Sequence, residues 1–149
     1  MWAILSGACR FPVVAAWSHT AARRMLRRWL SALADNERIR ADYPETCAPF
    51  VETTHPIRLR LLRWTDTGDA TGADARIMDG LLQLPGGRGA IGAASIGGNT
   101  RGLCATLPDG QTLRPDVLFL DDPQDKATAE SPALIRKTIE RIESDLFNL

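Results

Sequence analysis

The chain has 149 residues, of which 44% are hydrophobic and 24% are charged, and its formal net charge is zero. This composition is typical of a globular domain and excludes a disordered chain. No apolar run approaches the roughly 18–20 residues that a membrane-spanning helix needs. The charge is uneven, because residues 1–63 hold ten Arg and five acids (+5), whereas residues 64–149 hold eight basic and thirteen acidic residues (−5). A basic half can contact nucleic acid, but it fits solvated helix faces equally well.

The N-terminus and the cysteines point to a cytoplasmic protein. The opening stretch MWAILSGAC is apolar, but it lacks a basic segment and is short for a secretion signal. Cys9, Cys47 and Cys104 are odd in number and form no CxxC pair. We therefore expect reduced, buried thiols and no disulfide.

The first part of the chain predicts a strand followed by helices. Residues 12–17 (PVVAAW) form a short apolar run that is typical of a buried parallel strand. Ser18 or Thr20 is the expected N-cap of a helix over 21–33, where apolar residues recur every three or four positions and four arginines fall mostly on the other face. Residues 36–43 predict a second short helix that ends at Pro44.

The middle of the chain predicts strands and hairpins. Residues 57–64 alternate like an exposed or edge strand, and 65–75 read as a loop. The stretch ARIMDGLLQLPGG predicts a hairpin that turns at Asp79-Gly80, and 90–96 predict a buried strand. The stretch LCATLPDGQTLRPD predicts another hairpin, with its turn at 108–110.

The last part predicts a strand and a well-marked helix. Residues 117–120 are fully apolar and predict a short buried strand. Ser131 is the expected helix cap and Pro132 the first helical residue. One apolar stripe follows, formed by Leu134, Ile135, Ile139, Ile142 and Leu146. Strands that alternate with helices indicate an α/β domain with a largely parallel sheet and one or two added antiparallel hairpins.

The stretch RPDVLFLDDPQD, residues 114–125, is the strongest functional signal. Four apolar residues supply a rigid buried strand that ends in two carboxylates, Asp121 and Asp122. Magnesium bound to nucleotide phosphates needs hard oxygen ligands and keeps several waters, so one carboxylate can hold it. A second carboxylate beside it can orient or deprotonate the attacking water. The pattern indicates nucleotide hydrolysis, and an ordinary strand that ends in a turn remains the alternative.

No phosphate-binding loop accompanies this strand. The glycine-rich stretch 85–102 contains no GxxxxGK[ST] motif, because the sequence has no Gly-Lys pair. Its spacing Gly87-x-Gly89-x-x-Gly92 leads into a strand-like run, whereas a dinucleotide-binding loop opens a helix. Arg101 is a candidate charge-stabilising arginine, with a surface salt bridge as the alternative. His19 and His55 receive no catalytic role, since neither has a nucleophile partner in a recognisable motif.

Several segments in order resemble the large subunit of tailed-phage terminases, the ATP-driven motor that packages viral DNA. The specific part is RPDVLFLDDPQ, followed by SP, a helix and Asp. RFPVVAAWSHTAARRMLRRW, LADNERIRADYPETCAPF, GNTRGL and ESPALIRKTIERIESDLFNL support the resemblance.

The resemblance implies a partial P-loop NTPase domain of the ASCE-like type that lacks the Walker A loop and the nuclease domain. It divides the chain into the five segments that follow: 1–11, the tail of a helix after the missing loop; 12–35, strand and helix; 57–113, strands and hairpins; 114–122, the Walker B-like strand; 131–147, a helix.

The resemblance also implies roles and partners. Asp121 would be the Walker B magnesium carboxylate, and Asp122 would stand where many members have the catalytic Glu, one methylene shorter. ATP and Mg²⁺ are the expected cofactors of the full-length parent. Its expected partners are double-stranded phage DNA, a small terminase subunit and the portal of the procapsid, in the cytoplasm of a bacterial host, with a homo-oligomeric ring and no membrane.

Two alternatives stay open. The chain fits a non-catalytic prophage remnant or binding module whose Arg-rich helix, 21–33, contacts DNA or a partner protein. It also fits a different magnesium-dependent ATPase or nuclease that uses the two aspartates directly, although the sequence shows no third carboxylate near them.

Overall fold

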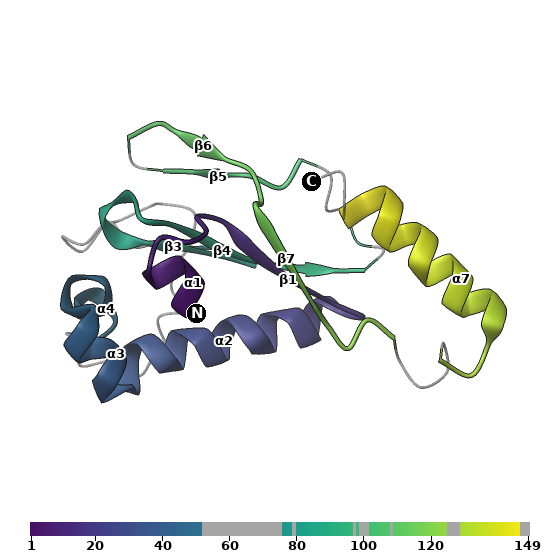
Figure 1. Ribbon diagram of the computed structural model, residues 1–149, viewed down its shortest axis with the longest axis horizontal. Helices are drawn as coiled ribbons and strands as arrows, with labels where there is room; N and C mark the ends of the chain where they lie inside the picture. The colour runs from purple at the N-terminus through teal and green to yellow at the C-terminus, as the bar shows by residue number, and fades with distance from the viewer. Residues whose placement is uncertain are drawn as a thin grey trace.

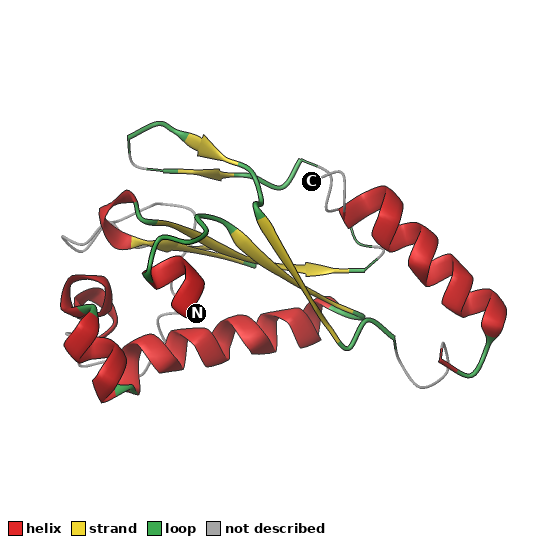
Figure 2. Ribbon diagram, viewed as in Figure 1, coloured by secondary structure: helices red, strands yellow, loops and turns green. Residues whose placement is uncertain are grey.

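The computed structural model describes residues 1–51, 76–78, 80–96, 98, 102–107, 109–124 and 129–146. They form a mixed α/β fold in which helices flank a five-stranded sheet and a separate two-stranded hairpin packs on it (Figures 1 and 2). The helices are α1 (Trp2–Leu5), α2 (His19–Asp35), α3 (Glu37–Asp42), α4 (Pro44–Val51), the 3₁₀ turn η1 (Pro85–Gly87), α7 (Pro132–Arg141) and the π turn η2 (Ile142–Leu146). The strands are β1 (Pro12–Ala16), β2 (Arg76–Met78), β3 (Leu81–Leu84), β4 (Gly89–Ser95), β5 (Ala105–Thr106), β6 (Thr112–Leu113) and β7 (Val117–Asp121).

The sheet joins a parallel core to an antiparallel extension. Its order is β2-β3-β4-β1-β7, with β1 parallel to both β4 and β7. β3 pairs antiparallel with β2 and with β4. The α/β class and the added hairpins are therefore confirmed, and both predicted hairpins form, as β2–β3 and β5–β6. Asp79, Pro108 and the predicted strand and loop over 57–75 lie outside the described residues.

Local sequence explains the first strand and helix. β1 is buried at every position, which matches its unbroken apolar run. Ser18 is the N-cap of α2, because its side-chain oxygen accepts a hydrogen bond from Ala21 N at 3.1 Å. Asn36 ends α2 and caps α3 through its side chain, which accepts from the backbone N–H groups of Arg38 and Ile39.

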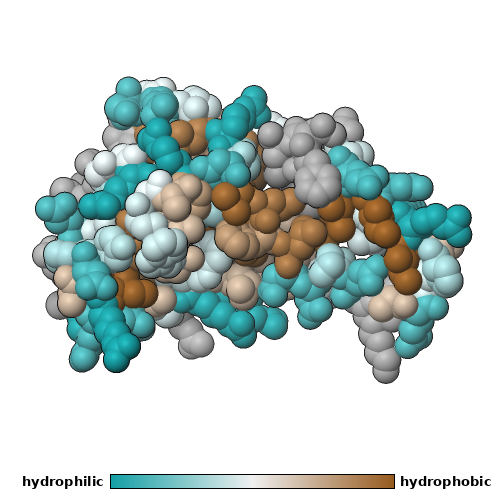
Figure 3. Space-filling view, in the orientation of Figure 1, coloured by the Kyte–Doolittle hydropathy of each residue, from teal (hydrophilic) through white to brown (hydrophobic). Residues whose placement is uncertain are grey.

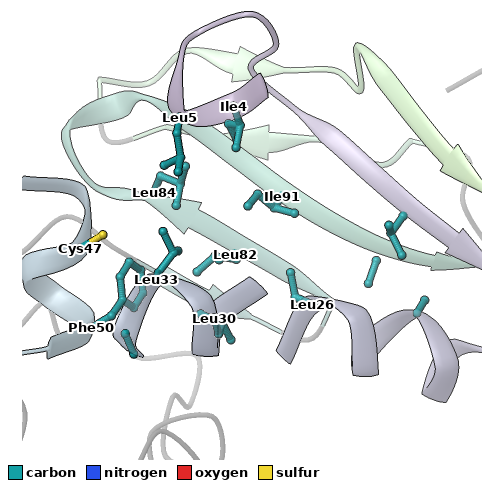
Figure 4. Packing of buried hydrophobic residues seen from close by; sticks show 14 of the residues in the cluster. Ile4, Leu5, Leu26, Leu30, Leu33, Cys47, Phe50, Leu82, Leu84 and Ile91 are labelled. Carbon is teal, nitrogen blue, oxygen red and sulfur yellow. The ribbon is translucent and has the colours of Figure 1, made fainter. Parts of the chain in front are cut away.

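The face of the sheet toward α2 carries the larger core cluster. Alternate strand residues, such as Val14, Leu82 and Ile91, point to this side and meet the apolar stripe of α2, which includes Leu26 and Leu30. Figure 4 shows Leu26 and Leu30 of the helix facing Leu82 and Ile91 of the strands, and residues of α1 and α4 belong to the same cluster. Burial of this stripe is the main reason that α2 is stable in the fold.

The opposite face is covered by the β5–β6 hairpin (Figure 1). Its core contains Phe11, Val13 and Leu81 from the sheet side, and Leu107 and Leu113 from the hairpin side. A polar contact adds to this packing, because the buried Gln83 donates from Nε2 to the carbonyl oxygen of Thr106 at 2.5 Å.

A carboxylate fixes the entry into β7. Asp116 accepts hydrogen bonds from the backbone N–H groups of Arg10 (2.5 Å) and Phe11 (2.9 Å). The backbone N–H of Asp116 also donates to the carbonyl oxygen of Phe11 at 3.2 Å. These contacts hold the start of β7 beside the start of β1, although the two segments are about a hundred residues apart in sequence.

Two predictions about the strands and helices need correction, and one helix was not predicted. The helical part of 1–11 ends at Leu5, and Gly7 then adopts a positive φ of 79° that breaks the helix. The second helix, α3, ends before Pro44 as predicted, but this proline also starts α4, since its missing N–H is not needed in a first turn. β7 is not a buried strand, because β1 is its single strand neighbour among the described residues.

The last helix begins as predicted, but its burial is different. Ser131 Oγ accepts from Leu134 N at 3.5 Å, and Pro132 is the first helical residue. α7 ends at Arg141, and the chain continues as the π turn η2. From the predicted stripe, Ile142 packs against the hairpin-side core, whereas Leu134 and Ile139 are exposed. None of the helices in the described ranges combines the length and apolarity that crossing a membrane requires.

Candidate functional site

The carboxyl ends of β1, β4 and β7 meet at one edge of the sheet. Because these strands are parallel, the residues that follow them lie side by side: Trp17 and Ser18 after β1, Ser95 and Ile96 at the end of β4, and Asp121 and Asp122 at the end of β7. In open α/β sheets this edge is the usual place for a ligand. The structure therefore places both predicted aspartates where the sequence analysis expected them.

Asp121 is the last residue of β7 and is exposed to solvent. Strand side chains alternate between faces, so Asp121 lies on the same side as Val117, which packs on the α2-side core, and Phe119. The ring of Phe119 makes an edge-to-face contact with Trp29 of α2, with centroids 6.4 Å apart. This aromatic contact ties β7 to α2 two residues before the carboxylate.

Asp122 has an unusual backbone conformation. Its φ of 50° is the single positive value at a non-glycine residue in the described part of the chain. Aspartate tolerates this left-handed region better than most residues, and its conformation here ends the strand before Pro123. The carbonyl oxygen of Asp122 accepts from Trp17 N at 3.3 Å, which holds the loop after β7 against the loop after β1.

Such backbone strain clusters at functional sites, and the inference runs from the observed outlier to a hypothesis of function. The backbone holds the two adjacent carboxylates differently, since Asp121 belongs to the strand β7 and Asp122 follows it at a bend with a positive φ. The pair can therefore serve two tasks at one edge, one as a metal ligand and one as a group that orients water.

The N-terminus of α2 faces the same edge. Ser18 caps the helix, and no acidic residue occupies its first turn. The exposed ring of Trp17 lies next to this cap. Sequence reasoning assigned Trp17 to the core and Ser18 to capping alone. Their closeness to Asp122 could not be read from the sequence, because it depends on the pairing of β1 with β7.

Two of the remaining candidate residues lie outside the described residues: Arg101, the predicted charge-stabilising residue, and His55. His19 is the first residue of α2 and lies beside Gly80, where a Cβ would come within 3.4 Å of the imidazole Cε1. The glycine-rich stretch supplies the turn η1 and the strand β4, which fits the strand-like run predicted after Gly87.

The donor set fits one kind of magnesium site. Among the described residues there is no cluster of three His, Cys, Asp or Glu side chains that could hold a metal ion. These residues therefore do not form a metal site whose ligands all come from protein side chains. Magnesium bound to a nucleotide needs only one or two carboxylates, because phosphate oxygens and waters complete its shell. Asp121 and Asp122, both exposed at one edge, fit that requirement.

The cysteines lie outside this edge. Cys9 and Cys47 are buried, as predicted, whereas Cys104 is exposed, which corrects the expectation for that residue. Burial raises the pKa of both buried thiols; the nearby Asp116 raises the pKa of Cys9 further, and Arg40 partly offsets the rise for Cys47. All three cysteines are free in the structure.

Comparisons with models of protein families, with curated proteins and with solved structures found no match for this chain.

Proposed function

We propose that this chain is part of the ATPase domain of a viral DNA-packaging terminase large subunit, a P-loop NTPase of the ASCE-like type. One observation carries the proposal: two aspartates end a strand at the carboxyl edge of parallel strands, one in the ladder and one on a left-handed turn. The ordered sequence resemblance around RPDVLFLDDPQ gives this edge its proposed chemistry.

The open side of β7 supports the proposal. β1 is the single strand paired with β7 in the described part of the fold, and Asp121 and Asp122 stand at the end of that unpaired side. An ATPase of this type needs a phosphate-loop strand close to its Walker B strand. The 149-residue sequence contains no such loop, and β7 leaves room for one.

In this proposal Asp121, Asp122 and Arg101 have different roles in ATP hydrolysis. Asp121 would hold Mg²⁺, which neutralises phosphate charge when it is bound. Asp122 would orient the attacking water and accept its proton, as a carboxylate one methylene shorter than glutamate. Arg101 would stabilise charge on the phosphates. Without the backbone amides and lysine of a phosphate loop, the isolated chain should be a poor ATPase.

The parent protein would couple this hydrolysis to moving double-stranded phage DNA into a procapsid. Its partners would be the terminase small subunit, the portal and further copies of itself in a ring, in the cytoplasm of a bacterial host. These partners rest on the resemblance and are part of the proposal.

The first experiment is to sequence the DNA upstream of the Met1 codon and translate it in frame. The proposal expects a strand followed by GxxxxGK[ST] within a short distance of Met1. An in-frame stop codon or unrelated sequence directly upstream would contradict ATP-driven packaging for this gene product.

The second experiment uses the longer reading frame and measures ATP hydrolysis. Asp121→Asn and Asp122→Asn should each lower the rate by about 10²-fold or more, since each removes a charged group from phosphoryl transfer. Asp42→Asn is the matched control, because Asp42 is an exposed aspartate on α3, away from the carboxyl edge. Equal activity in the three variants would remove both aspartates from the mechanism.

A second candidate function is a module that binds nucleic acid through α2. Arg24, Arg27 and Arg28 are exposed on the outer side of this helix, and none of them forms an ion pair with a described residue. α2 contains no acidic residue before Asp35. This candidate predicts salt-dependent DNA binding that Asp121→Ala leaves unchanged and that Arg24→Glu with Arg27→Glu abolishes. DNA binding that persists in the variant with Arg24→Glu and Arg27→Glu would contradict it.

A further inference from the structure

We propose that Trp29 of α2 is a positioning residue for Asp121 and acts through the ring of Phe119. This inference rests on the proposed function, because it concerns the carboxylate that would hold Mg²⁺. Trp29 and Phe119 lie far apart in the sequence, and only the fold brings their rings together.

The carboxyl end of β7 has little support from the sheet. β1 is its single strand neighbour among the described residues, and Phe119 and Leu120 are each 43% exposed. Figure 3 shows apolar side chains exposed over the middle of the molecule, where Figure 1 draws β7. Segments with few buried contacts open locally more readily than the core does. The ladder to β1 alone therefore holds Asp121 less firmly than a strand inside the sheet would hold it.

Trp29 supplies a contact on the side of β7 where Asp121 lies. Val117, Phe119 and Asp121 share one face of the strand, since side chains alternate. Val117 packs on the α2-side core, and the ring of Phe119 meets that of Trp29 edge to face, with an interplanar angle of 85°. Aromatic pairs prefer this geometry. The contact thus holds the residue that directly precedes Asp121 on this face.

The helix gives Trp29 a fixed position. α2 is anchored to the sheet by its buried stripe, which includes Leu26 and Leu30 on either side of Trp29 in the sequence. The side chain of Trp29 is partly buried and packs on the same core. A side chain positions its neighbour only when packing fixes its own orientation. Trp29 meets this requirement.

A second contact with the same strand–helix unit follows Asp121. The carbonyl oxygen of Asp122 accepts from the backbone N–H of Trp17 at 3.3 Å. Asp121 therefore lies between two contacts with the β1–α2 unit, one made by a side chain and one by the backbone. The backbone contact uses no side chain, so a substitution at Trp29 tests the aromatic contact alone.

The first test measures backbone hydrogen exchange in the 149-residue chain by mass spectrometry. Trp29→Leu keeps an apolar side chain on the core but removes the aromatic contact. Exchange in 117–121 should therefore become roughly 2- to 10-fold faster, which is the factor that such a contact is worth. Exchange in β4 should not change. Trp29→Phe retains a ring and should restore most of the protection of β7.

Leu33→Ala is the matched control for the exchange experiment. Leu33 is a fully buried residue of the same helix, and it lies beside Phe50 of α4 (Figure 4). Its loss should weaken the fold as a whole, so any faster exchange should affect β4 as well as β7. The same uniform increase in Trp29→Leu would show that Trp29 supports the fold in general, and would overturn the proposal. Unchanged exchange of 117–121 in Trp29→Leu would also overturn it.

The second test uses the longer reading frame and measures ATP hydrolysis against the Mg²⁺ concentration. Trp29→Leu should raise the Mg²⁺ concentration for half-maximal rate by roughly 2- to 10-fold, because a less ordered Asp121 binds the ion more weakly. Phe119→Leu should give the same shift. The double variant should shift it no further than either single variant, since each removes the same contact. Leu33→Ala should leave the Mg²⁺ dependence unchanged.

The outcomes separate this inference from the proposed function. Full activity in Asp121→Asn would contradict the proposed function, whatever the result for Trp29. Loss of activity in Asp121→Asn, with an unchanged Mg²⁺ dependence in Trp29→Leu, would overturn the role of Trp29 and leave the proposed function in place. Additive shifts from Trp29→Leu and Phe119→Leu would overturn that role too, because the two residues would then act separately.

Discussion

The two strand–helix units of this protein, β1–α2 and β7–α7, have similar sequence patterns and different surroundings. Each has a five-residue strand, apolar throughout in β1 and apolar over 117–120 in β7, and a later helix that is capped by serine and carries an apolar stripe. β1 lies between two strands and is buried throughout, and α2 covers the sheet. β7 has one strand neighbour, and α7 touches the hairpin-side core mainly through Ile142 just beyond its end.

The difference shows that the apolar sequence pattern of a strand or helix does not by itself determine whether that element is buried. An apolar run and a serine cap determine that a strand or helix forms, because these are local effects. Whether that element is covered depends on the neighbours that the chain brings to it. The same comparison explains why the candidate site is at the open unit: β7 presents its carboxylates where a further element or ligand has access.

The largest expected effect compares one substitution in the two helices. Leu30 of α2 is 1% exposed and Leu134 of α7 is 41% exposed. Leu30→Ala should lower the free energy of unfolding by about 2–5 kcal/mol, because it removes buried apolar atoms and leaves a cavity. Leu134→Ala should change it by less than about 1 kcal/mol. Urea denaturation measures both, and similar losses would show that α7 is covered in solution.

The next effect tests the close approach of Gly89, the first residue of β4, to the backbone just before β1. Gly89 has a φ of 151°, and a Cβ there would overlap the carbonyl oxygen of Arg10. Gly89→Ala should lower the free energy of unfolding by roughly 2–4 kcal/mol, through backbone strain and the clash. Gly110→Ala is the control, since Gly110 also has a positive φ but has nothing within 4 Å of its Cβ position. If thermal unfolding shows equal losses, strain alone explains the effect of Gly89→Ala.

A smaller effect tests the link between the two units. Asp116→Ala removes the carboxylate that accepts from the backbone of Arg10 and Phe11. We expect a loss of about 1–2 kcal/mol, because these groups are partly exposed and water can replace part of the interaction. Asp109→Ala, which loses one hydrogen bond within the β5–β6 turn, should have a smaller effect. If chemical denaturation showed a larger loss of stability for Asp109→Ala than for Asp116→Ala, Asp116 would not be the residue that positions β7.

The smallest effect leaves stability unchanged and compares thiol reactivity. Cys104 is exposed, whereas Cys9 and Cys47 are buried with pKa values raised by that burial. At neutral pH a thiol reagent should label Cys104 first and leave the other two until the protein unfolds, because the thiolate is the reactive form. Peptide mass spectrometry gives the order. Early labelling of Cys47 would show that α4 detaches readily from α2.

Much of the local structure followed from the sequence. The start of α7 at Pro132 and the two hairpins were predicted correctly, and Ser18 is one of the two caps predicted for α2, because capping and turn chemistry act over a few residues. The two aspartates at the end of a strand were also found from the sequence alone. The start of α4 at Pro44 was missed, since a proline ends one helix and begins another equally well.

The tertiary structure decided what local patterns could not. It placed β1 between β4 and β7, brought Trp17 and Ser18 beside Asp122, and left β7 at the edge of the sheet. These facts depend on strand order, which joins residues about a hundred positions apart. The sequence by itself determined where the two hairpins form and where α2 and α7 begin, because short-range hydrogen bonding and side-chain periodicity are encoded locally. Burial and the candidate site depend on long-range pairing, and only the folded chain defines them.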